Sequence, residues 1–333
     1  MTSCKSPIDP ITIPSVDDIH YAAERIAGHA VRTPLLESAY LNDVVGGRLL
    51  IKAEPLQRTG SFKFRGAFNT LSQIPENERE NGVVAFSSGN HAQGVACAAQ
   101  LLGIPAVIVM PEDAPALKIE NTRKYRAEVV LYDRYTEDRE SIGAEIAAKN
   151  GSILVKPYDD PRVIAGQGTV GLEITEQVGA NLDQVLCCVG GGGLISGVAL
   201  AVNEIFPDAA IYASEPIGFD SMARSLRVGK RVGNEPGSKT ICDALMPPQP
   251  GEYPFAISYE LLSGGLSVSD NQVRAAMAEA FLHLKLVVEP GGVVALAAAL
   301  SGLITCKDKT TAIICSGGNV DPVFFSKVLD GYF

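Results

Sequence analysis

Short apolar runs separated by helix-length amphipathic stretches recur along most of this 333-residue chain. The runs predicted as strands cover residues 48–54, 83–86, 106–110, 128–132, 185–189, 210–214 and 311–315. The stretches predicted as helices cover approximately residues 91–102, 116–125, 136–150, 194–205, 270–284 and 293–303. Apolar strands that alternate with helices indicate parallel sheets covered by helices on both faces. The pattern therefore predicts an α/β fold of two domains with open, mostly parallel, twisted sheets.

The order of these elements predicts how the domains divide the chain. A first helix is expected to begin after Ser15, which has acidic residues behind it as an N-cap does, and to be closed by Gly28. Residues 61–159 are expected to form a smaller, mobile α/β domain, inserted into a larger domain built from residues 1–60 and 160–333. The Gly- and Pro-rich stretch 228–254 is expected to be a surface excursion.

Charge and cysteine content narrow the class of function. A formal net charge of -10 and a pI near 5.0, without a basic run, argue against a nucleic-acid partner and favour small-molecule chemistry. Seven cysteines without metal-ligand spacing indicate reduced thiols and a cytoplasmic protein. Residues 1–14 lack the pattern of a signal peptide, and no apolar stretch reaches the ~20 residues that cross a membrane.

Three of the predicted strands end in polar turns that contain glycine. The turns are Ser87-Ser88-Gly89-Asn90-His91, Gly190-Gly191-Gly192-Gly193 and Ser316-Gly317-Gly318-Asn319. In open α/β sheets, ligands bind beyond the carboxyl ends of the strands. The three turns are therefore expected to meet at one cleft.

Two of these turns suit anionic groups. The four glycines at 190–193 let backbone N–H groups and a helix N-terminus approach a phosphate, although a flexible turn for close helix packing is the alternative interpretation. Their spacing fits neither the dinucleotide fingerprint nor a Walker motif. The turn at 87–91 suits a substrate carboxylate, although an ordinary helix N-cap would look similar. His91 is either a general base or a structural hydrogen-bond partner, and the sequence leaves both open.

Lys63 is the candidate nucleophile. It lies among small, aromatic and polar residues where an apolar strand gives way to a helix. A lysine in a dry, concave site loses hydration and can form a Schiff base with an aldehyde cofactor. A solvated surface lysine is the alternative interpretation.

The combination of motifs resembles the serine/threonine dehydratase and serine racemase family, from about Ile19 to the C-terminus. Members of this family use pyridoxal 5'-phosphate (PLP) and have the tryptophan-synthase-β fold, PLP-dependent fold type II. The motifs are Ser61-Phe62-Lys63-Phe64-Arg65-Gly66-Ala67, Ser87-Ser88-Gly89-Asn90-His91-Ala92-Gln93-Gly94, Gly166-Gln167-Gly168-Thr169, Gly190 to Gly193 and Ser316-Gly317-Gly318-Asn319.

The resemblance implies roles for individual residues. Lys63 would carry the cofactor as a Schiff base, Phe62 would pack on its ring, and Asn90 would bind its phenolic oxygen. The glycines at 190–193 would bind its phosphate, and Glu289 would lie behind it. The substrate would be bound by Ser87, Ser88, Gly89, Asn90, His91 and Arg139.

Ser316 would meet the pyridine nitrogen of the cofactor. A neutral serine stabilises a protonated ring less than an aspartate would, which favours rapid loss of a β-leaving group over transamination. The implied enzyme is a dehydratase in which Lys63 removes the α-proton, the β-hydroxyl leaves, and a 2-oxo acid and ammonia are formed. L-Threonine or L-serine is the first substrate expected, and a 3-hydroxyaspartate dehydratase or a serine racemase is the alternative. The non-enzyme alternative is an α/β module that binds a phosphorylated ligand.

Two residues bear on the choice among these activities. A serine at the position of Ser88 is the second acid/base in family members that racemise, although some hydroxyaspartate dehydratases are similar there. Arg139 corresponds to an arginine near the active cleft of the family and would pair with a second carboxylate, as 3-hydroxyaspartate would need. A surface arginine is the alternative.

The remaining expectations also come from the resemblance. Glu215 lies in a segment that binds a divalent ion in some relatives, which makes it a candidate Mg²⁺ ligand, but Ser221 stands where those relatives have an aspartate. Arg126 stands where a glycine is usual. Without the C-terminal regulatory domain of biosynthetic threonine dehydratases, a catabolic role is expected, and the family also implies a homodimer.

Overall fold

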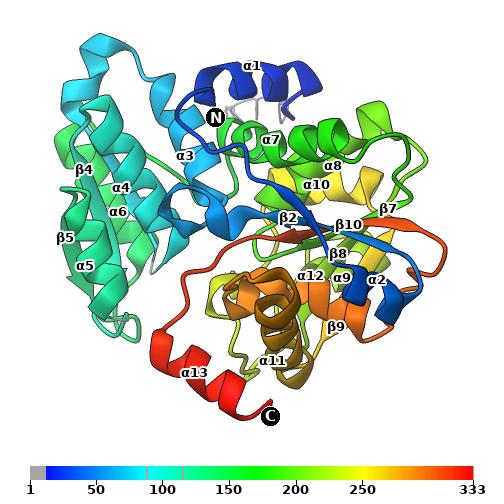
Figure 1. The fold of residues 1–333 in the computed structure, drawn as a ribbon. Helices are drawn as coiled ribbons and strands as arrows, with labels where there is room; N and C mark the ends of the chain where they lie inside the picture. Colours follow the sequence, from blue (N-terminus) through cyan, green and yellow to red (C-terminus); the bar gives the residue numbers. More distant parts are fainter. Residues whose placement is uncertain (1–12, 88, 115, 333) are drawn as a thin grey trace, which may run out of the picture.

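The computed structural model describes residues 13–87, 89–114 and 116–332, and it contains two β-sheets covered by helices (Figure 1). The larger sheet has the strand order β1-β2-β10-β7-β8-β9, and the smaller has the order β5-β4-β3-β6. Among the described residues, every strand pair is parallel except β1 with β2. The strands are β1 Leu35–Glu37, β2 Arg48–Ala53, β3 Val83–Phe86, β4 Ala106–Pro111, β5 Glu128–Tyr132, β6 Ile153–Leu154, β7 Gln184–Cys188, β8 Ala210–Pro216, β9 Gly264–Val268 and β10 Thr310–Cys315. The predicted fold class is confirmed.

Most helices lie where the pattern predicts them, with differences at their ends. The helices are α1 Val16–Ile26, α2 Ala39–Val45, α3 Lys63–Ser72, α4 Asn90–Leu102, α5 Ala116–Lys124, α6 Arg139–Asn150, α7 Pro161–Gln177, α8 Gly193–Ile205, α9 Ser221–Val228, α10 Glu252–Leu261, α11 Asp270–Glu279, α12 Pro290–Leu300 and α13 Pro322–Asp330. Helix α6 begins three residues later than predicted, because the Asp138 carboxylate accepts N–H bonds from Glu140 and Ser141 as an N-cap. The helix predicted over 270–284 changes after α11 into a π-helical turn, Ala280–Leu284.

The prediction for residues 228–254 is wrong in part. Helix α10 begins inside this stretch, and Cys242 and Leu245 are buried, where Leu245 lies beside Gly291 of α12. Proline and glycine correctly indicate irregular backbone here, but they do not show whether that backbone lies on the surface or against the core.

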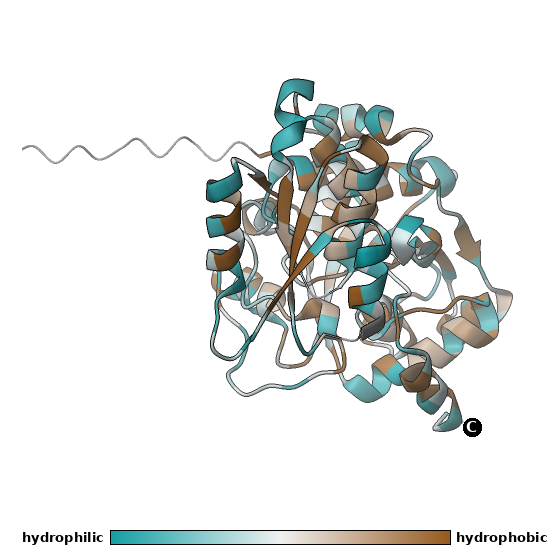
Figure 2. Ribbon diagram, turned by 90° about the vertical axis from the view of Figure 1, so that its left-hand side faces the viewer, coloured by the Kyte–Doolittle hydropathy of each residue, from teal (hydrophilic) through white to brown (hydrophobic). Residues whose placement is uncertain are grey.

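The first helix shows how local sequence produces the start of the fold. Ser15 Oγ accepts a hydrogen bond from the Asp18 backbone N–H, and the Asp18 carboxylate accepts one from the Ser15 N–H, which completes a capping box. The apolar side of α1, Ile19, Ala22 and Ile26, is buried. Figure 2 shows the same division elsewhere, with apolar strands inside and the polar sides of helices outside.

The larger lobe has its core around α12, between the sheet and the peripheral helices. Every residue of α12 except Leu300 is buried, and the helix packs against β7, β8, β9 and β10. A separate apolar cluster forms the core of the smaller sheet with α3 and α4. The strands of the smaller sheet all come from residues 83–154, and the division into an inserted domain stays a prediction. The boundaries proposed at 60/61 and 159/160 stay a prediction.

Three buried charges and the partly buried Glu173 connect the two lobes beneath α3. Arg65 donates hydrogen bonds to both oxygens of Glu54 at 2.8 and 2.9 Å, and to both oxygens of Glu173 at 2.7 and 3.0 Å. Lys52 donates to Glu173 at 2.6 Å. Burial alone would lower the pKa of Arg65, but the two carboxylates raise it above its ordinary value. The cluster is neutral overall, and it fixes α3 against the end of β2 and against α7.

One local departure from the family pattern has a visible conformational cost. Arg126 has a φ of 62°, in the left-handed region that glycine adopts without strain. A residue with a Cβ is destabilised by roughly 1–2 kcal/mol in this region. The turn between α5 and β5 therefore keeps the backbone conformation of a glycine turn but lowers the stability of the fold. In the described part of the chain, no helix combines the length and the apolar character that a membrane crossing requires.

Candidate active site

The three glycine-containing turns open into one cavity of about 550 Å³ at the carboxyl ends of β3, β7 and β10. Loops of both sheets contribute to its wall. The predicted site residues that line it are Phe62, Lys63, Ser87, Gly89, Asn90, His91, Arg139, Gly190, Gly191, Gly192, Gly193, Glu289 and Ser316. Ser88 lies outside the described residues, and Glu215 lies away from the cavity.

Lys63 faces this cavity from the first position of α3. Its Nζ donates a hydrogen bond to the Pro157 carbonyl at 2.6 Å and lies 5.2 Å from the centre of the Phe62 ring. The surrounding protein desolvates the ammonium and lowers the pKa of Lys63 to about 8, an effect that Cys188 partly offsets. A useful fraction of the amine is therefore neutral near physiological pH, as a nucleophile or base requires.

The glycine turn leaves a concave backbone surface without side chains. A Cβ on Gly191 would lie 2.2 Å from Cγ of Tyr158, and one on Gly193 would lie 2.9 Å from the Tyr158 carbonyl oxygen. Gly192 has a φ of 95°, and it precedes α8 without a side-chain cap. Uncapped N–H groups at a helix N-terminus bind anions. The chemistry of this turn fits the phosphate of a cofactor.

Gly191→Ala is expected to weaken the binding of PLP to the apoprotein. The new methyl group would overlap the Tyr158 ring, and overpacking of this kind costs about 1–3 kcal/mol, or roughly a 5- to 150-fold rise in Kd. Titration of apoprotein with PLP, followed by fluorescence, measures the change. Gly190→Ala is the matched control, since its Cβ would meet nothing closer than Pro247 Cδ, at 3.2 Å. Equal effects of the two substitutions would contradict the prediction.

A row of side chains from both lobes orients Asn90. The Asn90 Nδ2 donates to Glu289 Oε1, and the Asn90 Oδ1 accepts from Asn319 Nδ2 at 2.7 Å. Asn319 also donates to the Thr59 carbonyl at 2.7 Å. Burial raises the pKa of Glu289 to about 7, while Lys118 and the Asn90 hydrogen bond act in the opposite direction. Among the described residues, the second N–H of the Asn90 amide makes no hydrogen bond, and Asn90 lines the cavity.

The start of α4 presents uncapped N–H groups beside this row. Its N-cap is Gly89, which makes no side-chain cap, and the Gly89 N–H is bonded to Ser87 Oγ at 3.2 Å. The N–H groups of the first turn therefore suit a carboxylate. His91 is buried, and its Nε2 must donate to the Val155 carbonyl at 3.0 Å. Burial, and then Lys63, lower the pKa of His91 to about 3, so the structure favours the structural role for this histidine.

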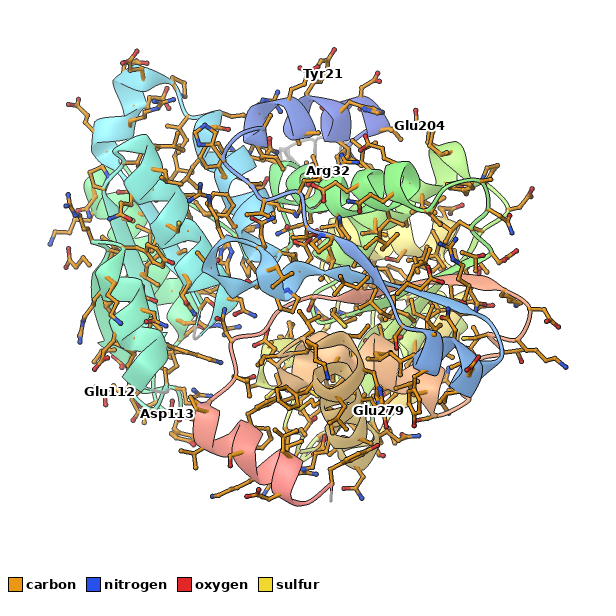
Figure 3. All side chains as sticks on the ribbon, viewed as in Figure 1. Tyr21, Arg32, Glu112, Asp113, Glu204 and Glu279 are labelled. Carbon is orange, nitrogen blue, oxygen red and sulfur yellow. The ribbon has the colours of Figure 1, made fainter. Side chains whose placement is uncertain are left out.

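The opposite wall carries cations. Arg134 pairs with Asp113 at 2.6 Å, and Lys118 pairs with Asp243 at 2.7 Å. Arg139 lies with its guanidinium 5.6 Å from the centre of the Phe86 ring. Within the described ranges, no carboxylate comes within 4 Å of the Arg139 guanidinium. Asp113 is labelled in Figure 3, beside α5.

Sequence reasoning missed several residues of this wall. Lys118, Arg134, Tyr158 and Asp243 line the cavity but were not predicted. Arg134 carried a usable signal, because it follows a predicted strand at its carboxyl end. Asp243 had no such signal in the sequence, because it belongs to the irregular stretch 228–254 that was expected on the surface.

Glu215 stays only a prediction as a metal ligand. Its two oxygens accept backbone N–H bonds from Met222 at 2.9 Å and Ala223 at 2.8 Å, at the start of α9. Burial raises the pKa of Glu215 to about 8, and the two N–H bonds lower it. In the part of the chain that the structure describes, no group of three or more His, Cys, Asp or Glu side chains is arranged to hold a metal.

Comparisons with known proteins show the family of this chain. A family model described as "Pyridoxal-phosphate dependent enzyme" matches residues 26–317. The chain is 45% identical to an L-threo-3-hydroxyaspartate ammonia-lyase of Saccharomyces cerevisiae, covering 96% of this chain and 97% of the relative. It is 43% identical to a serine racemase of Schizosaccharomyces pombe, covering 94% and 96%. Its fold matches the processed form of threonine deaminase isoform 2 from Solanum lycopersicum with a TM-score of 0.86 and 35% identity, covering 99% of each chain. The chain therefore belongs to the family of pyridoxal-phosphate-dependent enzymes, and it is a PLP-dependent lyase of fold type II.

Proposed function

We propose that this lyase converts L-threo-3-hydroxyaspartate into a 2-oxo acid and ammonia. The observation that carries the proposal is Arg139, a cavity arginine with no carboxylate of its own among the described residues. Apart from Lys63 on α3, the cavity has two other cationic side chains, and each pairs with a carboxylate: Arg134 with Asp113 and Lys118 with Asp243. A substrate with a second carboxylate would supply the missing charge. The similarity to a hydroxyaspartate ammonia-lyase supports the same substrate.

The described residues account for the steps of this reaction. The N–H groups at the start of α4 hold the α-carboxylate, and Arg139 holds the distal carboxylate. Lys63 Nζ takes the α-proton, the C–O bond at the β-carbon breaks, and the hydroxyl leaves as water after it takes up a proton. PLP, when bound, supplies the electron sink that makes the α-proton acidic. The released enamine tautomerises to an imine, which water hydrolyses to the 2-oxo acid and ammonia.

L-Threonine and L-serine, which the sequence ranked first, become the second candidates. Neither has a second carboxylate, so each would leave the Arg139 charge in the cavity without a partner. Serine racemisation is the third candidate, supported by the similarity to a serine racemase. It would need Ser88 as the second acid/base, and that residue lies outside the described residues.

One labelling experiment and one substrate panel test the proposal. Borohydride reduction of the holoenzyme and peptide mapping should place a pyridoxyl group on Lys63; without that label, the phosphorylated-ligand module becomes the better interpretation. The panel compares L-threo-3-hydroxyaspartate, L-threonine and L-serine, and measures both 2-oxo acid and D-amino acid. A higher kcat/KM for either monocarboxylate would overturn the proposed substrate, and D-serine as the main product would favour the racemase.

Arg139→Met should lower kcat/KM for L-threo-3-hydroxyaspartate by about 10- to 150-fold, because a hydrogen bond to a charged group contributes about 1.5–3 kcal/mol. The value for L-serine should change by less than about threefold. Steady-state kinetics with both substrates give the two ratios. Arg123→Met, which removes an exposed arginine of α5, is the control. A similar loss with both substrates would contradict the assignment of Arg139 to the distal carboxylate.

We also propose a cytoplasmic homodimer, as the sequence suggests. The six cysteines from Cys97 to Cys315 are free and buried, as in a reducing compartment. Size-exclusion chromatography with light scattering would measure the oligomeric state.

A further inference from the structure

Tyr158 occupies a position that joins the two functional halves of the cavity. It lies in the connection from β6 to α7, directly after Pro157, whose carbonyl accepts the hydrogen bond of Lys63 Nζ. Its ring fills the space over Gly191, where a Cβ would lie 2.2 to 2.4 Å from three ring atoms. The ring therefore packs on the glycine turn, one residue after the carbonyl that binds the nucleophilic amine.

The hydroxyl of Tyr158 has no hydrogen-bond partner among the described residues, although the side chain is partly buried and lines the cavity. A phenol O–H that belongs to a cavity-lining side chain and has no protein partner is available to donate to a bound ligand. Desolvation raises the pKa of Tyr158 above its ordinary value. The group is thus a hydrogen-bond donor at neutral pH and not a phenolate.

The charges near this phenol indicate what it can bind. Arg139 and Arg231 contribute positive charge, while Glu140 and Asp159 contribute negative charge. Among the described residues, neither carboxylate forms a hydrogen bond with the hydroxyl, and Asp159 Oδ1 instead accepts one from the Tyr253 N–H at 3.0 Å. Arg139 has no carboxylate nearby among the described residues and faces the same cavity. An anionic ligand would serve both groups at once.

We propose that the Tyr158 hydroxyl donates a hydrogen bond to an anionic oxygen of a bound ligand, and that it is a further binding and specificity residue of this enzyme. Two ligands carry such an oxygen: the phosphate on the glycine turn and the distal carboxylate of the substrate. A bond to the distal carboxylate rests on the proposed function. A bond to the phosphate does not, because it depends only on the cofactor.

Tyr158→Phe separates these sources, since it removes the hydroxyl and keeps the ring over Gly191. In the first arm, apoprotein is titrated with PLP by fluorescence. In the second, L-aspartate and L-alanine are titrated into the holoenzyme and followed by cofactor absorbance; L-alanine lacks the distal carboxylate. A hydrogen bond to a charged group predicts a rise of about 10- to 150-fold in one of the two Kd values.

Each outcome decides the proposal. A weaker affinity for PLP assigns the hydroxyl to the phosphate, and a weaker affinity for L-aspartate alone assigns it to the distal carboxylate. Unchanged values for PLP, L-aspartate and L-alanine would overturn it. Neither arm uses turnover, so failure of L-threo-3-hydroxyaspartate as a substrate would refute the proposed function without deciding the role of Tyr158. Tyr253→Phe removes a phenol of α10 that is not among the cavity-lining residues, and it controls for loss of any phenol.

Discussion

Lys63→Ala is expected to abolish 2-oxo acid formation, with a fall in kcat of at least about 10⁴-fold. The substitution removes both the amine that attaches the cofactor and the base that takes the α-proton, and general base catalysis alone accounts for about 10²–10⁴-fold. The surrounding protein that desolvates Lys63 and lowers its pKa to about 8 would still be present in the variant, but the amine itself would be missing. Coupled assay of the 2-oxo acid gives the rate, and absorbance spectra show whether PLP is still bound.

Lys156→Ala is the control for this experiment, because Lys156 is an exposed lysine in the same connection as Pro157. It should keep both activity and borohydride labelling. If Lys63→Ala retained more than about one per cent of kcat, both assigned roles of Lys63 would be wrong.

Arg65→Met is expected to lower the free energy of unfolding by about 3–5 kcal/mol. It would leave the buried carboxylate of Glu54 and the partly buried carboxylate of Glu173 without their guanidinium partner. Removing one partner of a buried ion pair costs about 3–5 kcal/mol. Because a loss of that size can prevent folding, the thermal midpoint is compared for Arg65→Lys as well. Lysine keeps the charge but not the two-pronged hydrogen bonds, so its midpoint should lie between those of wild type and Arg65→Met.

The exposed pair of Arg32 with Glu176 supplies the matched control. Figure 3 labels Arg32 on the outer side of the chain near α7, and its side chain is 56% exposed. Arg32→Met should cost about 0–1 kcal/mol, since water screens such pairs. Thermal denaturation followed by circular dichroism compares the variants. Equal losses for Arg65→Met and Arg32→Met would show that the buried cluster contributes no more than a surface pair.

Local pattern predicted most strands, because a strand covered on both faces of a parallel sheet is mostly apolar along its length, as 83–86 and 311–315 are. Helix α7 was missed because its two-sided burial removes the amphipathic signal: it packs against α3 on one side and α8 on another. Helix α10 was missed for a different reason, since prolines flank and enter its first turn.

The residues of the candidate site also fall into a group that local sequence predicts and a group that it does not. Lys63, Asn90, the glycines at 190–193 and Ser316 could be assigned because each lies in a motif with its own local signal, and all of them line the cavity. Tyr158 and Asp243 could not, because their importance depends on which distant backbone they contact. The clash that a side chain at Gly191 would make can be recognised only when the position of the Tyr158 ring is known.

The pairing of β2 with β10 bears on when, during synthesis of the chain, the predicted cofactor site can first form. Residues 48–53 pair with 310–315, and the same neighbours continue as the Ser61–Gly317 bridge and the Phe62 N–H bond to the Ser316 carbonyl. The ribosome adds about 5–20 residues per second, so the roughly 250 residues from Lys63 to Ser316 delay this pairing by on the order of 10–50 s. During that interval one edge of β2 lacks its partner β10, and an unpaired strand edge is a template for association with other chains. If Ser316 and the glycines at 190–193 hold PLP as the sequence predicts, the complete cofactor site is expected to form only after nearly the whole chain has been made.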